Sequence, residues 1–312
     1  MFRMFGTALA VCLAAPLPAG QDKLTNAIPD AGQQIAFLNH IYAIVDDETA
    51  EAIRTSAFLR EFSSLDVTTV TANDGQRWTG RYMRGRETYA EFFASDDLQP
   101  PNPTVVGAVG IALSGDTAGA IDTVERRLKE SAIPTQANVR RRRYGEKEVD
   151  WFKYLDISDG QPGESALSIY AMEYLPGFFA VPEANKEAAE TPADTISRER
   201  YIDDGYRDRL MRDITAIEVA VRREDFRRME PMLRAAGFRL SEGSAGAAAD
   251  GADVDVEFLF VMPDVIGLRR IDFALNRPVR EMRSEVIGKS RLILGPGSQA
   301  RWIFAREGGL NR

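Results

Sequence analysis

One pattern recurs along this chain: a strand, a helix and three further strands. The first copy starts with the apolar, strand-like run IAFLNHIYAIV at 35–45, and an amphipathic helical segment follows at 46–62. Three strand-like runs complete it, namely DVTTVTA, RWTGRYMRG and TYAEFFA. Because such a unit cannot bury its own sheet face, copies of it must pack on one another, and this limits the fold more than any single segment does.

Two further copies follow. The second has a strand at 105–114, a helix at 117–131, and then the strand-like runs ANVRRRRYG, VDWFKYLDI and ALSIYAMEYL. The third has a strand at 214–221 and a helix at 223–237, and the strand-like runs FRLSEG, VDVEFLFVM, LRRIDFALN, SRLILG and ARWIF come after them. The segment SAGAAADGAD at 244–253 is predicted to be a flexible hairpin tip or loop. The pattern predicts an α+β protein.

The N-terminus has the three parts of a secretory signal peptide: Arg3, an apolar run from Phe5 to Ala15, and an exit of small residues with prolines. We therefore expect cleavage and a periplasmic or secreted protein. A lipid anchor on Cys12 is the alternative. No other stretch approaches the ~20 apolar residues of a spanning helix, so we expect no membrane span after cleavage. The predicted parts are a signal peptide at 1–20, paired modules at 33–181, a linker and helix at 182–212, and a third module at 213–307.

Composition excludes several classes of site. The only cysteine is Cys12, so a cleaved chain would have no disulfide, thiolate metal ligand or cysteine nucleophile. The formal net charge of −8 argues against nucleic acid as a partner, because phosphate binding needs a basic surface. We expect a small-molecule ligand instead.

Particular phrases carry a family resemblance. The paired modules, together with LNHIY, SAFLREF, WTGRY, TYAEFF and GIALSGD, resemble an uncharacterised bacterial glyoxalase-like family of the vicinal oxygen chelate superfamily, the glyoxalase and bleomycin-resistance fold. The resemblance covers residues 33–180 well and the C-terminal module in outline. It implies that two modules curl into a cup-shaped mixed sheet, with a third similar module after it.

The resemblance also implies a site. Metal ligands in that superfamily come from the first and last strands of each module and face into the cup. The matching residues here are His40, which is the only histidine, with Glu91 and Glu173. The fourth position, around Val109 and Gly110, has no ligating side chain.

One imidazole and two carboxylates suit a divalent ion such as Mn, Fe, Ni or Zn, and Glu91 or Glu173 could then also carry a proton in catalysis. The two-histidine iron triad is excluded, because the chain has one histidine. The alternative is no metal: His40 would be an ordinary hydrogen-bonded strand residue, and the two glutamates would pair with arginines.

Five further residues are candidate ligand-binding groups. Arg81, Arg140 and Arg142 could bind a carboxylate or phosphate by paired hydrogen bonds if they face inward. Trp78 and Tyr154 could line the cup. The alternatives are a solvated sheet edge for the arginines and plain core for the aromatic residues.

Three functions remain open. The first is an exported, metal-dependent lyase, isomerase or hydrolase that acts on a small oxygen-rich molecule. The second is a non-catalytic protein that binds a small molecule for sequestration or sensing. The third is an envelope assembly component. With no fourth module expected to complete a second cup, the third module would pack on the main domain or on a second copy, which predicts a homodimer in the latter case.

Overall fold

The structure is a computed structural model. It describes residues 32–71, 77–98, 105–158, 166–181, 196–202, 204–262 and 265–304. The predicted signal peptide at 1–20 and the first part of the predicted linker, 182–195, lie outside the described residues.

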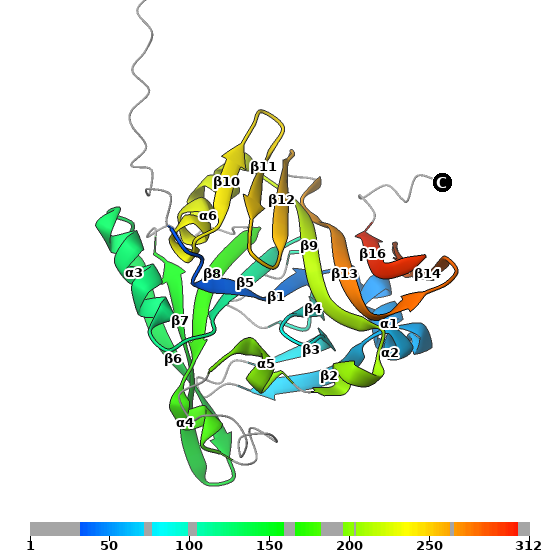
Figure 1. The fold of residues 1–312 in the computed structure, drawn as a ribbon, viewed down its shortest axis with the longest axis horizontal. Coiled ribbons are helices and arrows are strands. Elements are labelled where there is room, and N and C mark those ends of the chain that lie inside the picture. The colour runs from blue at the N-terminus through cyan, green and yellow to red at the C-terminus, as the bar shows by residue number, and fades with distance from the viewer. Residues whose placement is uncertain are drawn as a thin grey trace, which may run out of the picture.

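The described strands form two eight-stranded mixed sheets with the same strand order. The first sheet has the order β2-β3-β4-β1-β5-β8-β7-β6 and the second has β10-β11-β12-β9-β13-β16-β15-β14. In Figure 1 the first sheet, blue to green, curls into a half-barrel, and the second, yellow to red, lies against it. The predicted α+β class and the paired modules are confirmed, and the arrangement is consistent with a vicinal-oxygen-chelate-like fold.

The first sheet is built from two complete modules. The first contains β1 (Ala36–Ile44), α1 (Asp47–Thr55), α2 (Ala57–Phe62), β2 (Ser64–Thr71), β3 (Arg77–Arg84) and β4 (Tyr89–Phe93). The second contains β5 (Val109–Gly115), α3 (Ala120–Glu130), β6 (Thr135–Tyr144), β7 (Lys147–Ile157) and β8 (Leu167–Tyr174). The described residues that follow include two short α-helices, α4 (Pro176–Phe179) and α5 (Arg198–Tyr201), and a 3₁₀ helix at Asp204–Asp208.

The second sheet holds the third module and also a fourth. The third contains β9 (Met211–Val221), α6 (Arg223–Ala236), β10 (Arg239–Glu242), β11 (Gly246–Asp250) and β12 (Asp255–Phe260). The fourth contains β13 (Gly267–Val279), β14 (Arg283–Ile287), β15 (Ser290–Leu294) and β16 (Gly297–Phe304). The expectation of no fourth module is thus corrected. This module lacks a helix between its first two strands, so the helical part of the repeat is missing from its sequence.

The segment at 244–253 is also corrected, because it contains β11 rather than only a loop. β11 pairs with β10 on one side and with β12 on the other. Ala247 and Ala249 alternate toward the core and are buried. Their small side chains give little strand signal in the sequence, and the neighbouring strands supply the pairing that holds them extended.

Side chains fix where the helices of the first sheet begin. Asp46 accepts a hydrogen bond from the Thr49 amide at the start of α1, and Ser56 accepts one from the Leu59 amide at the start of α2. Such caps satisfy amides that have no partner inside the helix. The Ser56 cap explains why the predicted helix at 46–62 is divided into two.

The two sheets share one hydrophobic core on the outer face of the first sheet. Phe92 of β4 contacts Trp302 of β16 with ring centroids 5.1 Å apart, and Phe62 of α2 lies 5.3 Å from Phe273 of β13. The inner face of the first sheet is left for the cup that holds the candidate site. No helix among the described residues is long and apolar enough to cross a membrane.

Candidate functional site

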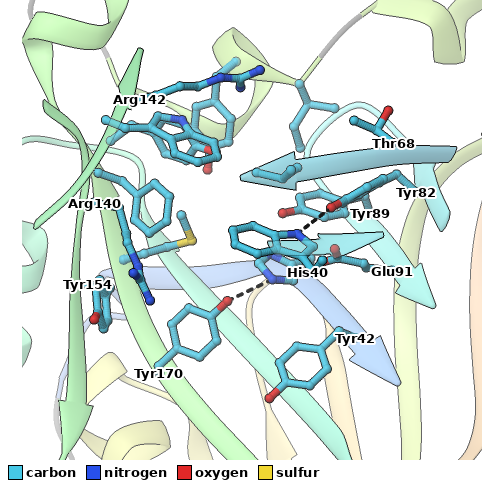
Figure 2. Close-up of a pocket in the computed structure, with 18 of the residues that line it drawn as sticks. His40, Tyr42, Thr68, Tyr82, Tyr89, Glu91, Arg140, Arg142, Tyr154 and Tyr170 are labelled. Carbon is cyan, nitrogen blue, oxygen red and sulfur yellow. Dashed lines mark hydrogen bonds between the residues drawn. The ribbon is translucent and has the colours of Figure 1, made fainter. Parts of the chain in front are cut away.

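The inner face of the first sheet encloses a cavity of about 620 Å³, which we call the cup. Side chains alternate along a strand, so Tyr89, Glu91 and Phe93 of β4 all face it, and Tyr170 of β8 faces it from the other module. Tyr201 of α5 also lines the cavity. Figure 2 shows the polar groups converging from both modules.

His40 lies at the floor of the cup, which we define as His40, Tyr42, Glu91 and Tyr170. Its ring stacks on Tyr89 with centroids 4.5 Å apart, and the residue is 5% exposed. Nδ1 lies 2.6 Å from Asn39 Oδ1, and Nε2 lies 3.0 Å from the Tyr170 hydroxyl. Burial lowers the pKa of His40 to about 3, so the imidazole is neutral at physiological pH.

Glu91 is the second acid–base group at the floor. It is hydrogen-bonded to Tyr82, whose hydroxyl oxygen in turn accepts from Trp78 Nε1 at 3.0 Å. Its Oε1 is buried and has no hydrogen-bond partner among the described residues. Burial raises the pKa of Glu91 to about 7, against smaller opposing effects of Tyr82 and Arg84. A carboxyl with this pKa can accept or donate a proton near neutrality.

Gly80 makes room for this carboxylate. A Cβ at position 80 would lie 2.6 Å from Glu91 Oε1 and also 2.6 Å from the Tyr82 ring. Any larger residue would force one of them to move. The glycine of the phrase WTGRY therefore shapes the cup.

The walls carry charges over aromatic rings. On β6 and β7, Arg140 lies 5.2 Å from the Tyr154 ring centroid and Arg142 lies 5.1 Å from that of Trp151. Asp156 faces the cup as well, and burial raises its pKa to about 6 against the lowering effect of Arg140. Because Arg142 stacks on an aromatic ring, the edge of its guanidinium group can form hydrogen bonds with an anion.

On the opposite wall, β3 contributes a third cationic group, which pairs with an acid on β2. Arg84 lies 4.9 Å from the Tyr82 ring centroid, and its Nη1 lies 3.5 Å from Asp66 Oδ2. Trp78 lines the cup beside them. Four of the five predicted ligand-binding residues, Trp78, Arg140, Arg142 and Tyr154, therefore line the cavity.

Arg81 is placed differently from its prediction. It forms a buried ion pair with Asp97, and it lies on the outer face of β3 because Trp78, Tyr82 and Arg84 take the inner face. Because side chains alternate between the two faces of a strand, Arg81 and its neighbour Tyr82 lie on opposite faces of β3.

Glu173 also lies outside the cup. Its carboxylate accepts hydrogen bonds from the amides of Gly119 at 2.9 Å and Ile121 at 3.1 Å, at the N-terminus of α3. Tyr174 and Met172 are the β8 residues that face inward at this level. The prediction that Glu173 joins His40 and Glu91 is corrected, because its position in β8 has the opposite parity.

Strand register identifies the residue that takes the predicted place of Glu173. Glu91 pairs with Tyr42 on β1, and Tyr170 pairs with Ala112 on β5. β1 and β5 pair antiparallel around Ile41 and Ile111. Each residue that follows them, Tyr42 in β1 and Ala112 in β5, therefore occupies the equivalent position in its module. Tyr170 is thus the counterpart of Glu91, and the sequence could have indicated it by counting register instead of searching for an acid.

The fourth predicted position is filled by a neighbour. Gly110 pairs with Tyr42 across the β1–β5 ladder, and a Cβ at Gly110 would lie 1.8 Å from the Tyr42 ring. The ring of Tyr42 therefore occupies the space where a ligating side chain would project.

The three predicted ligands do not converge on one point. Within the described ranges, no group of three histidine, cysteine, aspartate or glutamate side chains is arranged to hold a metal ion. Only His40 and Glu91 of the predicted set face the cup. The residues present do not fit the predicted three-ligand centre, and we derive no reaction step through a metal.

Solved structures resemble this chain at low identity. A hypothetical protein from Staphylococcus aureus is 11% identical with a TM-score of 0.50, over 81% of this chain and 96% of that one. A homoprotocatechuate 2,3-dioxygenase variant from B. fuscum is 15% identical with a TM-score of 0.36, over 75% of this chain and 54% of that chain. A fusion of a xylose isomerase-like TIM barrel with 4-hydroxyphenylpyruvate dioxygenase is 11% identical with a TM-score of 0.41, over 84% of this chain and 47% of that chain.

These likenesses concern the fold alone, and the chain spans about half the length of the two dioxygenase-containing chains. No curated protein matches the chain. A family model does match, over residues 38–304, and its description is a family of unknown function, DUF5829. The match covers most of the sequence, and the protein therefore belongs to this family.

Proposed function

We propose that the cup binds a small organic molecule with a flat apolar ring and oxygen-bearing substituents. The observation that carries this proposal is a cavity of about 620 Å³ with aromatic walls and a polar floor. Ligand pockets in proteins typically have ~300–1,000 Å³ and combine an apolar lining with a few placed polar groups.

The walls favour a ring. Trp78 and Tyr82 on one side, and Trp151 and Tyr154 on the other, offer flat surfaces for stacking. Arg142 adds a guanidinium group that can bind a carboxylate or a phosphate on the same molecule. The ligand class that fits is therefore a small aromatic or otherwise planar compound that carries oxygen.

Tryptophan fluorescence tests this proposal, because Trp78 and Trp151 line the cup and Trp302 is buried in the second sheet. Phenol and benzoate should change the emission saturably, and glucose, which has no aromatic ring, should not. Substituting Trp78→Phe or Trp151→Phe should reduce the change, since Trp302 reports nothing from the cup. Linear, unsaturable quenching that survives both substitutions would reject a cup site.

The metal-dependent lyase, isomerase or hydrolase predicted from the sequence is tested separately. Elemental analysis of the wild type should give no more metal than the His40→Ala and Glu91→Ala variants. About one equivalent of a divalent metal, lost in both variants, would contradict a metal-free binding cup and favour the enzyme.

We also propose that the chain is exported, on the strength of the N-terminal signal pattern. Protein recovered from the periplasm or medium should begin near Gly20 to Asp22 when its N-terminus is determined. An uncut chain found only in the cytoplasm would refute export.

A further inference from the structure

A directional chain of hydrogen bonds runs behind the floor of the cup. The Ser114 hydroxyl donates to the Gly115 carbonyl at 3.4 Å, and the Tyr201 hydroxyl donates to Ser114 Oγ at 3.0 Å. The Tyr201 oxygen accepts from Asn39 Nδ2 at 2.6 Å. Each hydroxyl has one proton to donate. Because Ser114 donates to Gly115, it accepts from Tyr201, and Tyr201 in turn accepts from Asn39.

The direction of proton donation in these bonds also determines which nitrogen of His40 carries its proton. Since the Asn39 nitrogen is committed to Tyr201, the Asn39 oxygen faces His40 Nδ1 at 2.6 Å and needs a proton there. A neutral imidazole carries a single N–H, so Nδ1 is the donor and Nε2 is the acceptor. Nε2 then receives the Tyr170 hydroxyl proton across 3.0 Å.

Tyr170 is the end of this chain at the cavity. Because its proton points to His40, its oxygen presents only lone pairs to the cup. A similar sequence runs on the other side, where Trp78 donates to Tyr82, which is hydrogen-bonded to Glu91. Glu91 Oε1 is left without a partner among the described residues and is buried.

We propose that the floor of the cup recognises its ligand through a hydrogen-bond donor, such as a hydroxyl group, held by Tyr170 Oη. This inference rests on the proposed function and names the group that the floor selects. His40 and Asn39 are positioning residues in it, because they act through Tyr170. The sequence predicts His40 as a metal ligand, but in the structure its Nε2 atom is hydrogen-bonded to Tyr170.

The His40 tautomer can be measured directly, because this is the only histidine of the chain. Protein labelled with heavy nitrogen at histidine should show one protonated Nδ1 and one unprotonated Nε2 by NMR at neutral pH. Tyr201→Phe, which keeps the ring that stacks on Tyr174, should release Asn39 and give a mixture of tautomers. A proton on Nε2 or a doubly protonated ring in the wild type would overturn the inference.

Phenol and anisole form a matched pair of probes, since anisole lacks the donor. Tryptophan indole NMR signals should show phenol binding about tenfold more tightly, the ratio expected for one hydrogen bond to a buried acceptor. Tyr170→Phe should reduce this ratio, while Tyr206→Phe, which removes the hydroxyl of a buried tyrosine outside the cup, should not.

The failures are distinguishable. Equal affinity for phenol and anisole in the wild type would overturn donor recognition and leave the cup as a binding site. Absence of binding by both probes, with no shift of the Trp78 or Trp151 signals, would overturn the proposed function and this inference with it.

Discussion

At the scale of single residues, burial moves the two acid–base groups of the floor in opposite directions. It lowers the pKa of His40 and raises that of Glu91, because in both cases the charged form loses hydration. The sequence could place both residues in the cup through the family resemblance. It could not supply their hydrogen-bond partners, since Asn39, Tyr201 and Tyr170 are brought together from separate segments by the fold.

Glu91→Gln should change the pH dependence of stability. The folded carboxyl keeps its proton up to a pKa of about 7, compared with an ordinary value of 4.5, so the native state binds more protons between these values. The wild-type free energy of unfolding should therefore fall relative to the variant as pH rises through this window, by about 1.4 kcal/mol per unit. Urea denaturation at several pH values measures this difference.

The same substitution at Glu130, which forms an exposed ion pair on α3, controls for the loss of a surface carboxylate. A difference between wild type and Glu91→Gln that stays constant from acid to neutral pH would contradict the buried, proton-holding carboxyl.

At the scale of elements, strand parity decides what the sequence could and could not reveal. Glu91 and Glu173 both stand in aromatic, strand-like phrases, and nothing in the phrases themselves says which face each one takes. In the structure, the Glu173 carboxylate caps the N-terminus of α3. The N-cap residue of this helix, Gly119, has a φ of 83° and no side chain that could cap it. A residue from β8 thus caps a helix that is distant in sequence, which local capping rules cannot detect.

Glu173→Ala should destabilise the protein without weakening ligand binding. The substitution removes the acceptor of two α3 amides, and losing a helix cap typically costs about 0.5–2 kcal/mol. Thermal unfolding measures the loss of stability, and the phenol titration measures binding. Unchanged stability combined with lost binding would mean that Glu173 acts in the cup after all.

At the scale of the whole molecule, the chain is a duplication of an eight-stranded sheet. The repeat could be recognised from sequence in three modules because each has a helix with clear amphipathic spacing. The fourth module was missed because it has no such helix, although the seven strands described after α6 are more than one module requires. The two sheets pack through their outer faces. In the sequence, the residues on these faces look like those of any other strand.

Arg198 ties the two sheets together. It is 3% exposed, its Nη1 lies 2.7 Å from Asp253 Oδ2 beside the second sheet, and its Nε lies 3.1 Å from Asp116 Oδ1 beside the first. Arg198→Met should lower the free energy of unfolding by about 1–3 kcal/mol, because it leaves the partly buried carboxylates of Asp116 and Asp253 without their cation.

Chemical denaturation of Arg198→Met tests this role. Arg126→Met is the matched control: Arg126 pairs with Glu130 at the surface, and such a pair contributes at most about 0.5 kcal/mol. Equal effects of the two substitutions would show that Arg198 does not join the sheets.

The central claim is that the cup of the first sheet holds a small ring-bearing ligand through its floor. A crystal structure of the wild-type protein soaked with phenol tests it most directly. The account predicts a ring between the aromatic walls, with its hydroxyl within hydrogen-bonding distance of Tyr170 Oη. An empty cup at saturating phenol, or a metal ion bound to His40 Nε2 with Tyr170 displaced, would contradict it.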